Sequence, residues 1–462
     1  MNYRDDKTGN NWTRAKIPVE MEETIKRYIS NDRRTIQGLY APSAPVNPEI
    51  RFQVNADGEL QLPQLLKDRL GISAGSELIA KETTEGIVLW PADPPLTKVY
   101  IEPTTACNYN CRTCVRNTWD EEIGSMPFSA YKRLLDDLKK VKSLRTMAFW
   151  GIGEPLMHPR IVEMISLAHG LSVKTELITN GALLKPSMAR NLIEAGLDTL
   201  VVSVDGTSSD NYEDIRCGGN LDQVQDNILE LQNIKWETER QNPELGLEFV
   251  VMKRNMDQLP ELWPMAFALG AAFIVLTNLL PYTEDMKEEI LYTQSARMDN
   301  DINRSRWQPE VLLPRMDMLP ECMDPLIRLL YLTGRPKIGL KEDAANDEGH
   351  CPFIWQGSAA VSWTGDVSPC VALLHSYRCF VLDRPKEIKK AVFGNIKEER
   401  LTDIWNKDRF KAFRRRVRAF EFPPCIDCGG CNLADSNEED CEGNPHPVCG
   451  DCLWARRVLL CP

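Results

Sequence analysis

Short apolar runs alternate with amphipathic helical stripes between residues 98 and 277. In one stripe, a single helix face carries Tyr131, Leu134, Leu135, Leu138 and Val141. Apolar runs separated by helices are typical of parallel strands that are buried on both faces. The pattern predicts strands at residues 98–102, 146–150, 173–178, 199–204, 247–252 and 272–277. It predicts helices at residues 131–141, 160–169, 187–195, 221–234 and 259–269.

Six strand–helix units predict an α/β fold, a partial (β/α)6 barrel rather than a full eight-unit barrel. We therefore assign residues 94–285 to this barrel. In such folds the chemistry takes place at the carboxyl ends of the strands, so the residues that follow each strand are the candidates for function.

The alternation stops on both sides of the barrel. Residues 1–48 are polar and are predicted to be an extension and linker. Residues 49–93 are predicted to form a small β-rich module, with a helix at 62–71 and a hairpin of 76–81 and 86–90. Residues 286–350 are predicted to be a helical bridging region, and residues 351–462 a Cys-rich C-terminal domain.

The composition narrows the class of protein. With 462 residues the chain is too long for one ordinary core. A net charge of −12 disfavours a nucleic-acid or anionic-membrane surface, and we expect the basic run at 414–418 to be a solvated helix face. No secretory signal and no apolar run of membrane-spanning length is visible, which predicts a cytoplasmic protein. Its 15 cysteines then indicate metal ligation or catalysis rather than disulfides.

Three cysteines follow the first predicted strand of the barrel, at the spacing C-x3-C-x2-C: Cys107, Cys111 and Cys114. Chance would give this spacing roughly 0.016 times per chain, so it indicates a function. Three thiolates on one short loop suit an iron–sulfur cluster with one iron left open, and the alternative is a structural zinc knuckle. The five histidines of the chain are scattered and predict no site.

The ends of the next strands carry residues that suit a polar ligand. Glycines allow close backbone approach, a carboxylate accepts hydrogen bonds from an ammonium group, and a guanidinium binds a carboxylate. The residues concerned are Gly151, Gly153, Glu154 and Pro155 after the second strand, Asn180 after the third, Ser203 and Asp205 after the fourth, and Arg216 beyond. Each motif is weak alone, but their order along one sheet edge predicts a joint binding site.

Together these motifs resemble the radical S-adenosylmethionine (SAM) superfamily. The resemblance implies that Cys107, Cys111 and Cys114 hold a 4Fe–4S cluster whose open iron chelates SAM. It implies cleavage of SAM to methionine and a 5′-deoxyadenosyl radical, with ferredoxin or flavodoxin as electron donor. Residues 151–155 match the family's Gly-Gly-Glu-Pro segment except for the inserted Ile152. The aromatic residue that often precedes the third cysteine is Thr113 here, and Tyr109 or Trp150 would substitute for it.

The C-terminal cysteines resemble the SPASM extension, which carries two auxiliary 4Fe–4S clusters in enzymes that modify peptides and proteins. The candidate ligands are Cys351, Cys370, Cys425, Cys428, Cys431, Cys441, Cys449, Cys452 and Cys461. The tail departs from the usual SPASM spacing, so the sequence does not pair cysteines with clusters, and zinc held by the 425/428 and 449/452 pairs is the alternative. We expect residues 351–461 to need bound metal to hold their fold together, because hydrophobic burial alone does not easily give them a core.

Residues 49–93 are similar to the AbrB/SpoVT swapped-hairpin family, which commonly binds DNA as an intertwined dimer. Residues 50–92 carry four basic and six acidic side chains, a net charge of −2. A phosphate-binding surface needs the opposite sign, which disfavours DNA binding, and we expect a homodimer contact or a substrate-docking role.

The combination of these parts looks like the radical SAM/SPASM maturases of tungsten-cofactor oxidoreductases. That resemblance implies modification of a partner protein, peptide or cofactor, with a tungstopterin oxidoreductase as the expected partner. The alternatives are a SPASM enzyme that acts on another peptide, and an iron–sulfur electron-transfer or sensor protein linked to DNA through residues 50–92.

Overall fold

The computed structural model describes one compact unit within Leu62–Pro462. The described residues are 62–72, 76–83, 86–293, 310–312, 316–317, 319–332, 337–338, 351–426 and 431–460. The predictions for residues 1–61, and for Cys428 and Cys461, lie outside these ranges.

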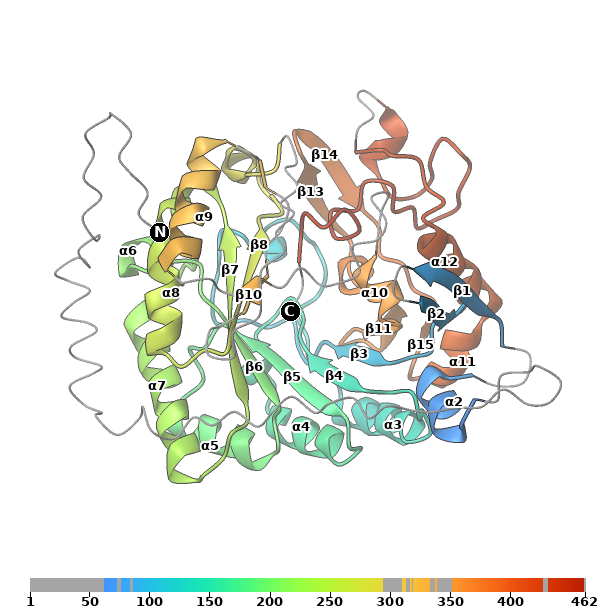
Figure 1. Cartoon of the computed structure of the whole chain (residues 1–462), viewed down its shortest axis with the longest axis horizontal. Coiled ribbons are helices and arrows are strands. Elements are labelled where there is room, and N and C mark those ends of the chain that lie inside the picture. The colour runs from blue at the N-terminus through green and yellow to red at the C-terminus, as the bar shows by residue number, and fades with distance from the viewer. Residues whose placement is uncertain are drawn as a thin grey trace. The chain divides into compact units, whose positions relative to one another are not determined.

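The six predicted barrel strands are present and lie parallel, each paired with the next along the chain. Figure 1 shows them as a fan of neighbouring arrows. Every residue of β6 is buried. A strand that is covered on both faces has apolar residues at successive positions and not at every second one, which explains the continuous apolar runs in the sequence. The strands are β3 (Lys98–Ile101), β4 (Thr146–Phe149), β5 (Lys174–Thr179), β6 (Thr199–Ser203), β7 (Glu244–Val251) and β8 (Phe273–Asn278).

The predicted helices connect these strands, and local sequence sets their ends. α5 begins with proline at its first position, and the Asn220 side chain caps α7 by accepting from the Gln223 amide at 2.8 Å. A short further helix, α6 (Ser209–Ile215), was not predicted. The predicted helices are α3 (Phe128–Leu138), α4 (Ile161–His169), α5 (Pro186–Glu194), α7 (Leu221–Glu237) and α8 (Leu259–Ala268).

The sheet extends beyond the barrel on both sides, in the order β10-β9-β8-β7-β6-β5-β4-β3-β11-β12-β15. β11 (Ser358–Val361), from the predicted C-terminal domain, pairs in parallel with β3. β12 (Asp366–Ser368) and β15 (Gly394–Asn395) follow it. The C-terminal region is therefore hydrogen-bonded directly to the strand that precedes the first cysteine motif.

The bridging region combines helix and strand. α9 (Pro320–Leu332) is a helix in the described part of this region. β9 (Glu310–Leu312) and β10 (Lys337–Ile338) were not predicted, because strands of two and three residues leave no periodic signal. Cys322 in α9 is a buried thiol, 1% exposed. Among the helices that the structure describes, none is long and apolar enough to cross a membrane.

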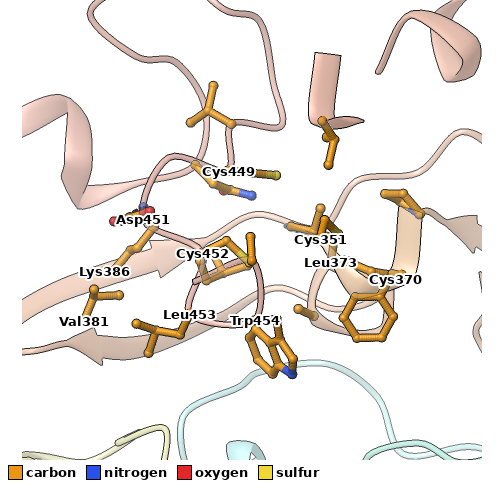
Figure 2. Close-up of a pocket in the computed structure, with 18 of the residues that line it drawn as sticks. Cys351, Cys370, Leu373, Val381, Lys386, Cys449, Asp451, Cys452, Leu453 and Trp454 are labelled. Carbon is orange, nitrogen blue, oxygen red and sulfur yellow. Dashed lines mark hydrogen bonds and ion pairs between the residues drawn. The ribbon is translucent and has the colours of Figure 1, made fainter. Parts of the chain in front are cut away.

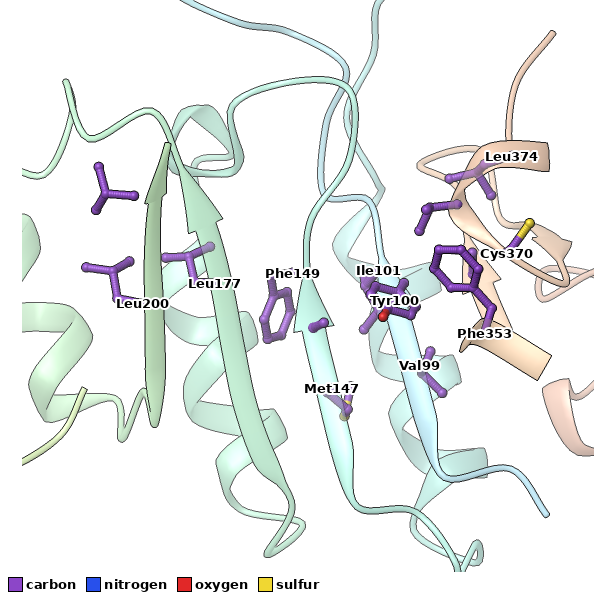
Figure 3. Close-up of a cluster of buried hydrophobic side chains, with 14 of the residues drawn as sticks. Val99, Tyr100, Ile101, Met147, Phe149, Leu177, Leu200, Phe353, Cys370 and Leu374 are labelled. Atoms are coloured by element: carbon purple, nitrogen blue, oxygen red, sulfur yellow. The ribbon is translucent and has the colours of Figure 1, made fainter. Parts of the chain in front are cut away.

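The core is continuous from the barrel into the C-terminal region. Figure 3 shows Val99, Tyr100 and Ile101 of β3 between Phe149 of β4 on one side and Phe353 of the C-terminal region on the other. Phe353 of α10 (Pro352–Trp355) lies edge-on to Tyr100, with ring centroids 5.8 Å apart.

The expectation that residues 351–461 lack a hydrophobic core is wrong for the first part of this region. Phe393, just before β15, stacks on Phe410 of α12 (Asp408–Ala419) with ring centroids 4.4 Å apart, and α11 (Leu401–Asn406) precedes α12. Ile404 and Val417 are also fully buried. Between residue 425 and Val448 few apolar side chains are buried. Only the last part of the chain therefore needs bound metal to stabilise its fold.

The N-terminal module forms the predicted helix and hairpin. α2 covers Gln64–Leu70, and β1 (Leu78–Thr83) pairs antiparallel with β2 (Gly86–Pro91). Trp90 lies against Trp355 at 6.5 Å between ring centroids. The hairpin is therefore packed on the C-terminal region.

The basic run at 414–418 is not a solvated face, contrary to the prediction. Arg414 is fully buried. Its Nε and Nη2 donate to the two carboxylate oxygens of Asp93 at 2.8 and 2.7 Å, and its guanidinium lies 3.9 Å above the Trp405 ring. Arg418 donates to the Pro91 carbonyl and lies over Trp355. These arginines join α12 to the end of the hairpin, because a planar guanidinium can pair and stack at once.

Replacing Arg414 with methionine should lower the free energy of unfolding by about 2–3 kcal/mol, since a hydrogen-bonded charge pair is lost. Urea denaturation of the cluster-loaded protein measures the change. Arg415→Met is the matched control, because Arg415 is exposed. Equal midpoints for the two variants would show that the Arg414–Asp93 pair does not stabilise the fold.

Candidate functional site

The three-cysteine loop lies at the carboxyl end of β3 and is fastened on two sides. The Asn110 amide donates to the Cys217 carbonyl and the Arg112 amide to the Ile215 carbonyl, both at 2.9 Å. On the other side, the Asn180 side chain donates to Asn108 at 2.9 Å. The backbone that carries Cys107, Cys111 and Cys114 is thus held by the ends of β5 and α6.

The loop thiols are partly buried. Burial raises the pKa of the Cys111 thiol to about 12, and the nearby thiols of Cys114 and Cys107 add to the effect. A metal reverses this, because a coordinating thiol loses its proton. In the described part of the chain, no three Cys, His, Asp or Glu side chains converge on a single ion-sized point. In a cluster, each thiolate binds its own iron, and three neighbouring thiols on one loop fit that demand.

The segment 151–155 follows β4 and lies against the cysteine loop. A Cβ at Gly153 would lie 2.4 Å from the Thr104 carbonyl oxygen and 2.5 Å from that of Ala106. The Glu154 amide donates to the Ala106 carbonyl at 2.8 Å. Glycine at position 153 is therefore required by close approach of the chain's own backbone, and its predicted role in admitting a ligand stays a prediction.

Gly153→Ala should raise the SAM concentration for half-maximal cleavage or lower the rate, with a combined loss of about 100-fold, because the segment must shift to admit a methyl group. A SAM titration of the cluster-loaded variant measures this. Gly170→Ala is the control, since Gly170 caps α4 with helical backbone angles. If the two variants cleave SAM equally well, the close approach at Gly153 has no role in the site.

Glu154 is buried, and both of its carboxylate oxygens are in use. Oε1 accepts from Thr179 Oγ1 at 2.7 Å and from the Leu156 amide at 3.0 Å, and Oε2 accepts from the Asn180 amide at 2.8 Å. Burial raises the pKa of this carboxyl, and the three hydrogen bonds oppose the rise. Glu154 thus ties the end of β4 to the end of β5. Its predicted contact with the SAM ammonium group stays a prediction, as does that of Pro155.

Ser203, Asp205 and Arg216 come together at the end of β6, as predicted. Arg216 Nη2 lies 2.8 Å from Asp205 Oδ2, and the Val250 amide donates to Asp205 Oδ1 at 3.0 Å. Ser203 donates to Glu248 Oε2 at 3.0 Å. Glu248 was missed by the sequence reasoning because it lies within β7 and not at a strand end. Burial raises the pKa of Glu248 to about 7, and neighbouring Asp205 contributes to the rise.

Arg216 keeps an unused donor in this cluster. Burial opposes its charge, but Asp205 together with Cys111, Tyr212 and Glu248 outweighs burial and raises the pKa of Arg216, so the guanidinium is charged. Within the described residues, its Nε finds no hydrogen-bond acceptor. A buried donor without a partner is costly, and an anionic or hydroxyl group of a ligand would satisfy it. The donor set therefore fits the carboxylate or ribose of SAM.

A second group of thiols lines a cavity of about 60 Å³ in the C-terminal region. Figure 2 shows Cys351, Cys370, Cys449 and Cys452 around this cavity. Cys449 and Cys452 share one turn, with the Cys452 amide donating to the Cys449 carbonyl at 3.1 Å, whereas Cys351 and Cys370 lie about 80 to 100 residues earlier, a separation that no local spacing reveals. Burial raises the pKa of Cys351 to about 12, with Cys452 contributing. Burial and the same neighbouring thiols also raise the pKa of Cys370 and of Cys449 well above the ordinary value.

Cys379, which the sequence reasoning left out, lines the same cavity from β13 (Tyr377–Val381). Cys425 and Cys441 belong elsewhere. A Cβ at Gly450 would lie 3.1 Å from Cys425 Sγ, and burial, with Asp451, Asp440 and Cys441 nearby, raises the pKa of Cys425 to about 11. The described tail thiols thus fall into at least two groups.

An aromatic layer lies between the first cysteine loop and this cavity. Tyr377 lines the cavity, and its ring lies edge-on to Tyr282 with centroids 5.7 Å apart. Tyr282, which follows β8, packs in one hydrophobic cluster with Val115, beside the cysteine loop, and Ile152. The two thiol groups are therefore connected by continuous packing rather than separated by solvent.

Comparison with known proteins matches residues 101–259 to the radical SAM superfamily and residues 351–432 to SPASM, an iron–sulfur cluster-binding domain. The tungsten-containing aldehyde ferredoxin oxidoreductase cofactor-modifying protein of Pyrococcus furiosus is 32% identical over 370 residues, which are 79% of this chain and 96% of the relative. The chain belongs to the radical SAM superfamily. It is an enzyme, and the radical SAM domain uses a 4Fe–4S cluster and SAM, with SPASM as an additional iron–sulfur domain.

Another relative is named as a peptide cyclase. The PqqA peptide cyclase of Gluconobacter oxydans is 26% identical and covers 79% of this chain and 93% of the relative. Among solved structures, Streptococcus suis SuiB bound to precursor peptide SuiA matches with a TM-score of 0.49 and 16% identity, covering 70% of this chain and 67% of that one. The anSMEcpe enzyme with bound AdoMet matches with a TM-score of 0.49 and 17% identity, covering 79% of this chain and 93% of that one.

Proposed function

We propose that this radical SAM enzyme cleaves SAM reductively at the Cys107–Cys111–Cys114 loop and uses the resulting radical to modify a partner. The observation that carries the proposal is the convergence, at the carboxyl ends of β3–β6, of the three-thiol loop, the close approach at Gly153 and the Arg216–Asp205 pair. An electron carrier would need the thiols but not a second, polar binding site beside them.

The residues of the site would have different roles. The three thiolates would hold the cluster and leave one iron open to SAM, and the bound cluster would supply the electron that breaks the SAM carbon–sulfur bond. Gly151 and Gly153 would let the 151–155 segment pack closely on Glu102 and on the Thr104 and Ala106 carbonyls, which would place its backbone beside the ligand. Arg216 and Ser203 would orient its carboxylate and ribose through hydrogen bonds, with Asp205 holding the Arg216 guanidinium in place.

The C-terminal thiols would hold auxiliary clusters. Cys351, Cys370, Cys449 and Cys452 surround one cavity, and four protein thiolates would leave that cluster no open iron. We therefore assign it the role of electron acceptor rather than of substrate ligand. The second cluster would draw on Cys425, Cys428, Cys431, Cys441 and Cys461.

The substrate we propose is the cofactor of a tungsten-containing aldehyde oxidoreductase, or a peptide that matures with it. The P. furiosus relative carries cofactor modification of such an oxidoreductase in its name, and its length is almost fully covered by this chain. The peptide alternative draws on relatives named as peptide cyclases. Ferredoxin or flavodoxin would supply electrons, and residues 49–93 would make a homodimer contact or dock the partner.

Anaerobic co-expression with a tungsten-containing aldehyde oxidoreductase tests the substrate. The intact mass of the oxidoreductase and the mass of its extracted cofactor are compared between the wild-type enzyme and Cys111→Ala. A mass difference in either, present only with the wild type, is the expected result. Identical masses of both protein and cofactor in a SAM-replete, tungstate-supplied host would contradict the proposed substrate.

A further inference from the structure

A buried histidine connects the C-terminal region to the SAM side of the barrel. His375, which is 2% exposed, follows the short helix η6 (Val371–Leu373). Its Nε2 lies 2.8 Å from Glu102 Oε2, and its Nδ1 lies 2.7 Å from Glu121 Oε2. Glu102 comes directly after β3, and Glu121 lies between the cysteine loop and α3. One side chain of the C-terminal region is thus held by two carboxylates of the barrel.

Each carboxylate also holds a backbone amide. Glu102 Oε1 accepts from the Ile152 amide at 3.1 Å, and Oε2 accepts from the Trp363 amide at 3.3 Å. Glu121 Oε1 accepts from the Ser376 amide at 2.9 Å. Gly151 packs closely on the same carboxylate side chain, since a Cβ there would lie 2.5 Å from Glu102 Cγ. The position of Glu102 therefore bears directly on that of Gly151 and Ile152.

The geometry selects a charged histidine. A neutral imidazole donates from one ring nitrogen only, whereas an imidazolium donates from both. Two carboxylate oxygens at 2.7 and 2.8 Å, one at each nitrogen, are satisfied together only by the imidazolium. Burial opposes this charge, but the bonds to Glu102 and Glu121 outweigh it and raise the pKa of His375 to about 9. The other groups that face this unit are the Trp119 ring, at 5.0 Å from the imidazole, and Lys390 near Glu121.

We propose that His375 is a positioning residue, whose bridge between Glu121 and Glu102 holds Gly151 and Ile152 in the place that SAM binding requires. The bridge makes the SAM segment depend on the C-terminal region, so the two iron–sulfur parts of the enzyme are coupled through hydrogen bonds as well as through packing. That SAM is the ligand of this segment rests on the proposed function. The hydrogen bonds of His375 to Glu102 and Glu121 are observed and do not depend on it.

The pH dependence has a definite sign. The folded pKa of about 9 lies above the ordinary value of 6.5, so the bridge contributes fully below about 6.5 and is lost as pH rises through about 9. Deprotonation leaves one of the two carboxylates without its donor. The Ile152 amide should then exchange its hydrogen more readily, beyond the ordinary effect of pH on exchange.

Hydrogen–deuterium exchange of the cluster-loaded protein, read by mass spectrometry on a peptide that contains residues 151–155, tests the bridge. His375→Gln cannot bond both carboxylates, and should raise exchange in this peptide at pH 7.5. It should also raise the SAM concentration for half-maximal cleavage about tenfold with a smaller change in kcat. His169→Gln is the matched control, because the His169 side chain is 53% exposed and lies outside the bridge.

Glu102→Gln provides a variant that keeps the shape of the bridge. Glutamine can still accept from the Ile152 amide and can donate to a neutral His375, although its amide nitrogen cannot accept the 3.3 Å bond from the Trp363 amide. Because Trp363 lies outside the peptide that is read, this variant should fold and show wild-type exchange in that peptide at pH 7.5. It should lack the additional rise in exchange that the wild type shows near pH 9. The proposal is overturned if His375→Gln and His169→Gln have the same exchange and the same SAM dependence. The proposal is also overturned if Glu102→Gln shows the same additional rise in hydrogen exchange near pH 9 as the wild type. Failure of the wild type to cleave SAM would contradict the proposed function, while the exchange data would still decide the bridge.

Discussion

Alanine at Cys107, Cys111 or Cys114 should each abolish SAM cleavage and leave the fold intact. Each of these thiols would bind a separate iron of the SAM cluster, and two remaining ligands do not hold a 4Fe–4S cluster in a reactive state. The loop itself is fixed by backbone hydrogen bonds from Asn110 and Arg112, which the substitutions do not remove. The loss of activity should therefore be complete without loss of structure.

Iron content and activity together measure this prediction. The wild type should bind about twelve irons per chain and each variant about eight. Cys322→Ala is the matched control, since Cys322 is a buried thiol in α9 outside both thiol groups, and it should keep the iron and the activity. SAM cleavage at wild-type rate by any of the three variants would show that the cluster lies elsewhere.

Removal of the auxiliary iron should unfold the tail before the barrel. In residues 431–447 the buried apolar side chains are few, Ala434 being one, and Asp440 is buried there as well. By contrast, β3–β8 are fastened by a continuous core. Bound metal would hold such a polar segment together, so chelation or Cys449→Ala should expose residues 425–460 to protease while residues 96–280 stay protected.

Limited proteolysis followed by peptide mapping checks this order. Cys217→Ala serves as the control, because it removes a partly exposed thiol outside the tail. If the tail stays resistant with about four irons per chain and zinc bound, the auxiliary clusters are absent and zinc holds the tail together.

The barrel could be predicted from the sequence because both faces of its strands are covered. The four residues of β3 and the five of β6 are short, but each is an apolar run followed by an amphipathic helix, and that order has few structural solutions. β11 could not be predicted in the same way. It pairs with β3, which lies more than half of the chain earlier in the sequence, and the residues Ser358–Val361 contain no signal that identifies β3 as the partner strand.

In the site, too, residues that lie close together in the sequence could be predicted, and residues that only the fold brings together could not. Cys107, Cys111 and Cys114 stand on one loop, so their spacing alone revealed them. Glu248, in contrast, enters the site from the middle of a strand, and the pairing of Cys351 with Cys452 depends on how the tail folds back. His375 looked like one of several scattered histidines because its two partners, Glu102 and Glu121, are more than 250 positions away in the sequence.

Arg414 illustrates a prediction that failed for a physical reason. A basic run on a helix is usually solvated, but here Asp93, just after the hairpin, offers a carboxylate, and Trp405 offers a ring face. A guanidinium can satisfy both while buried, which an ammonium cannot do as well. The charge pattern alone does not contain this information.

The most direct test of this account is the formation of 5′-deoxyadenosine by the wild-type enzyme. The protein is purified and reconstituted without oxygen, reduced with dithionite and incubated with SAM, and the nucleoside and methionine are quantified together. We predict that both form in equal amounts, that they require the reductant, and that Cys111→Ala forms neither. Absence of 5′-deoxyadenosine from a wild-type protein that carries its full iron content would contradict the central claim.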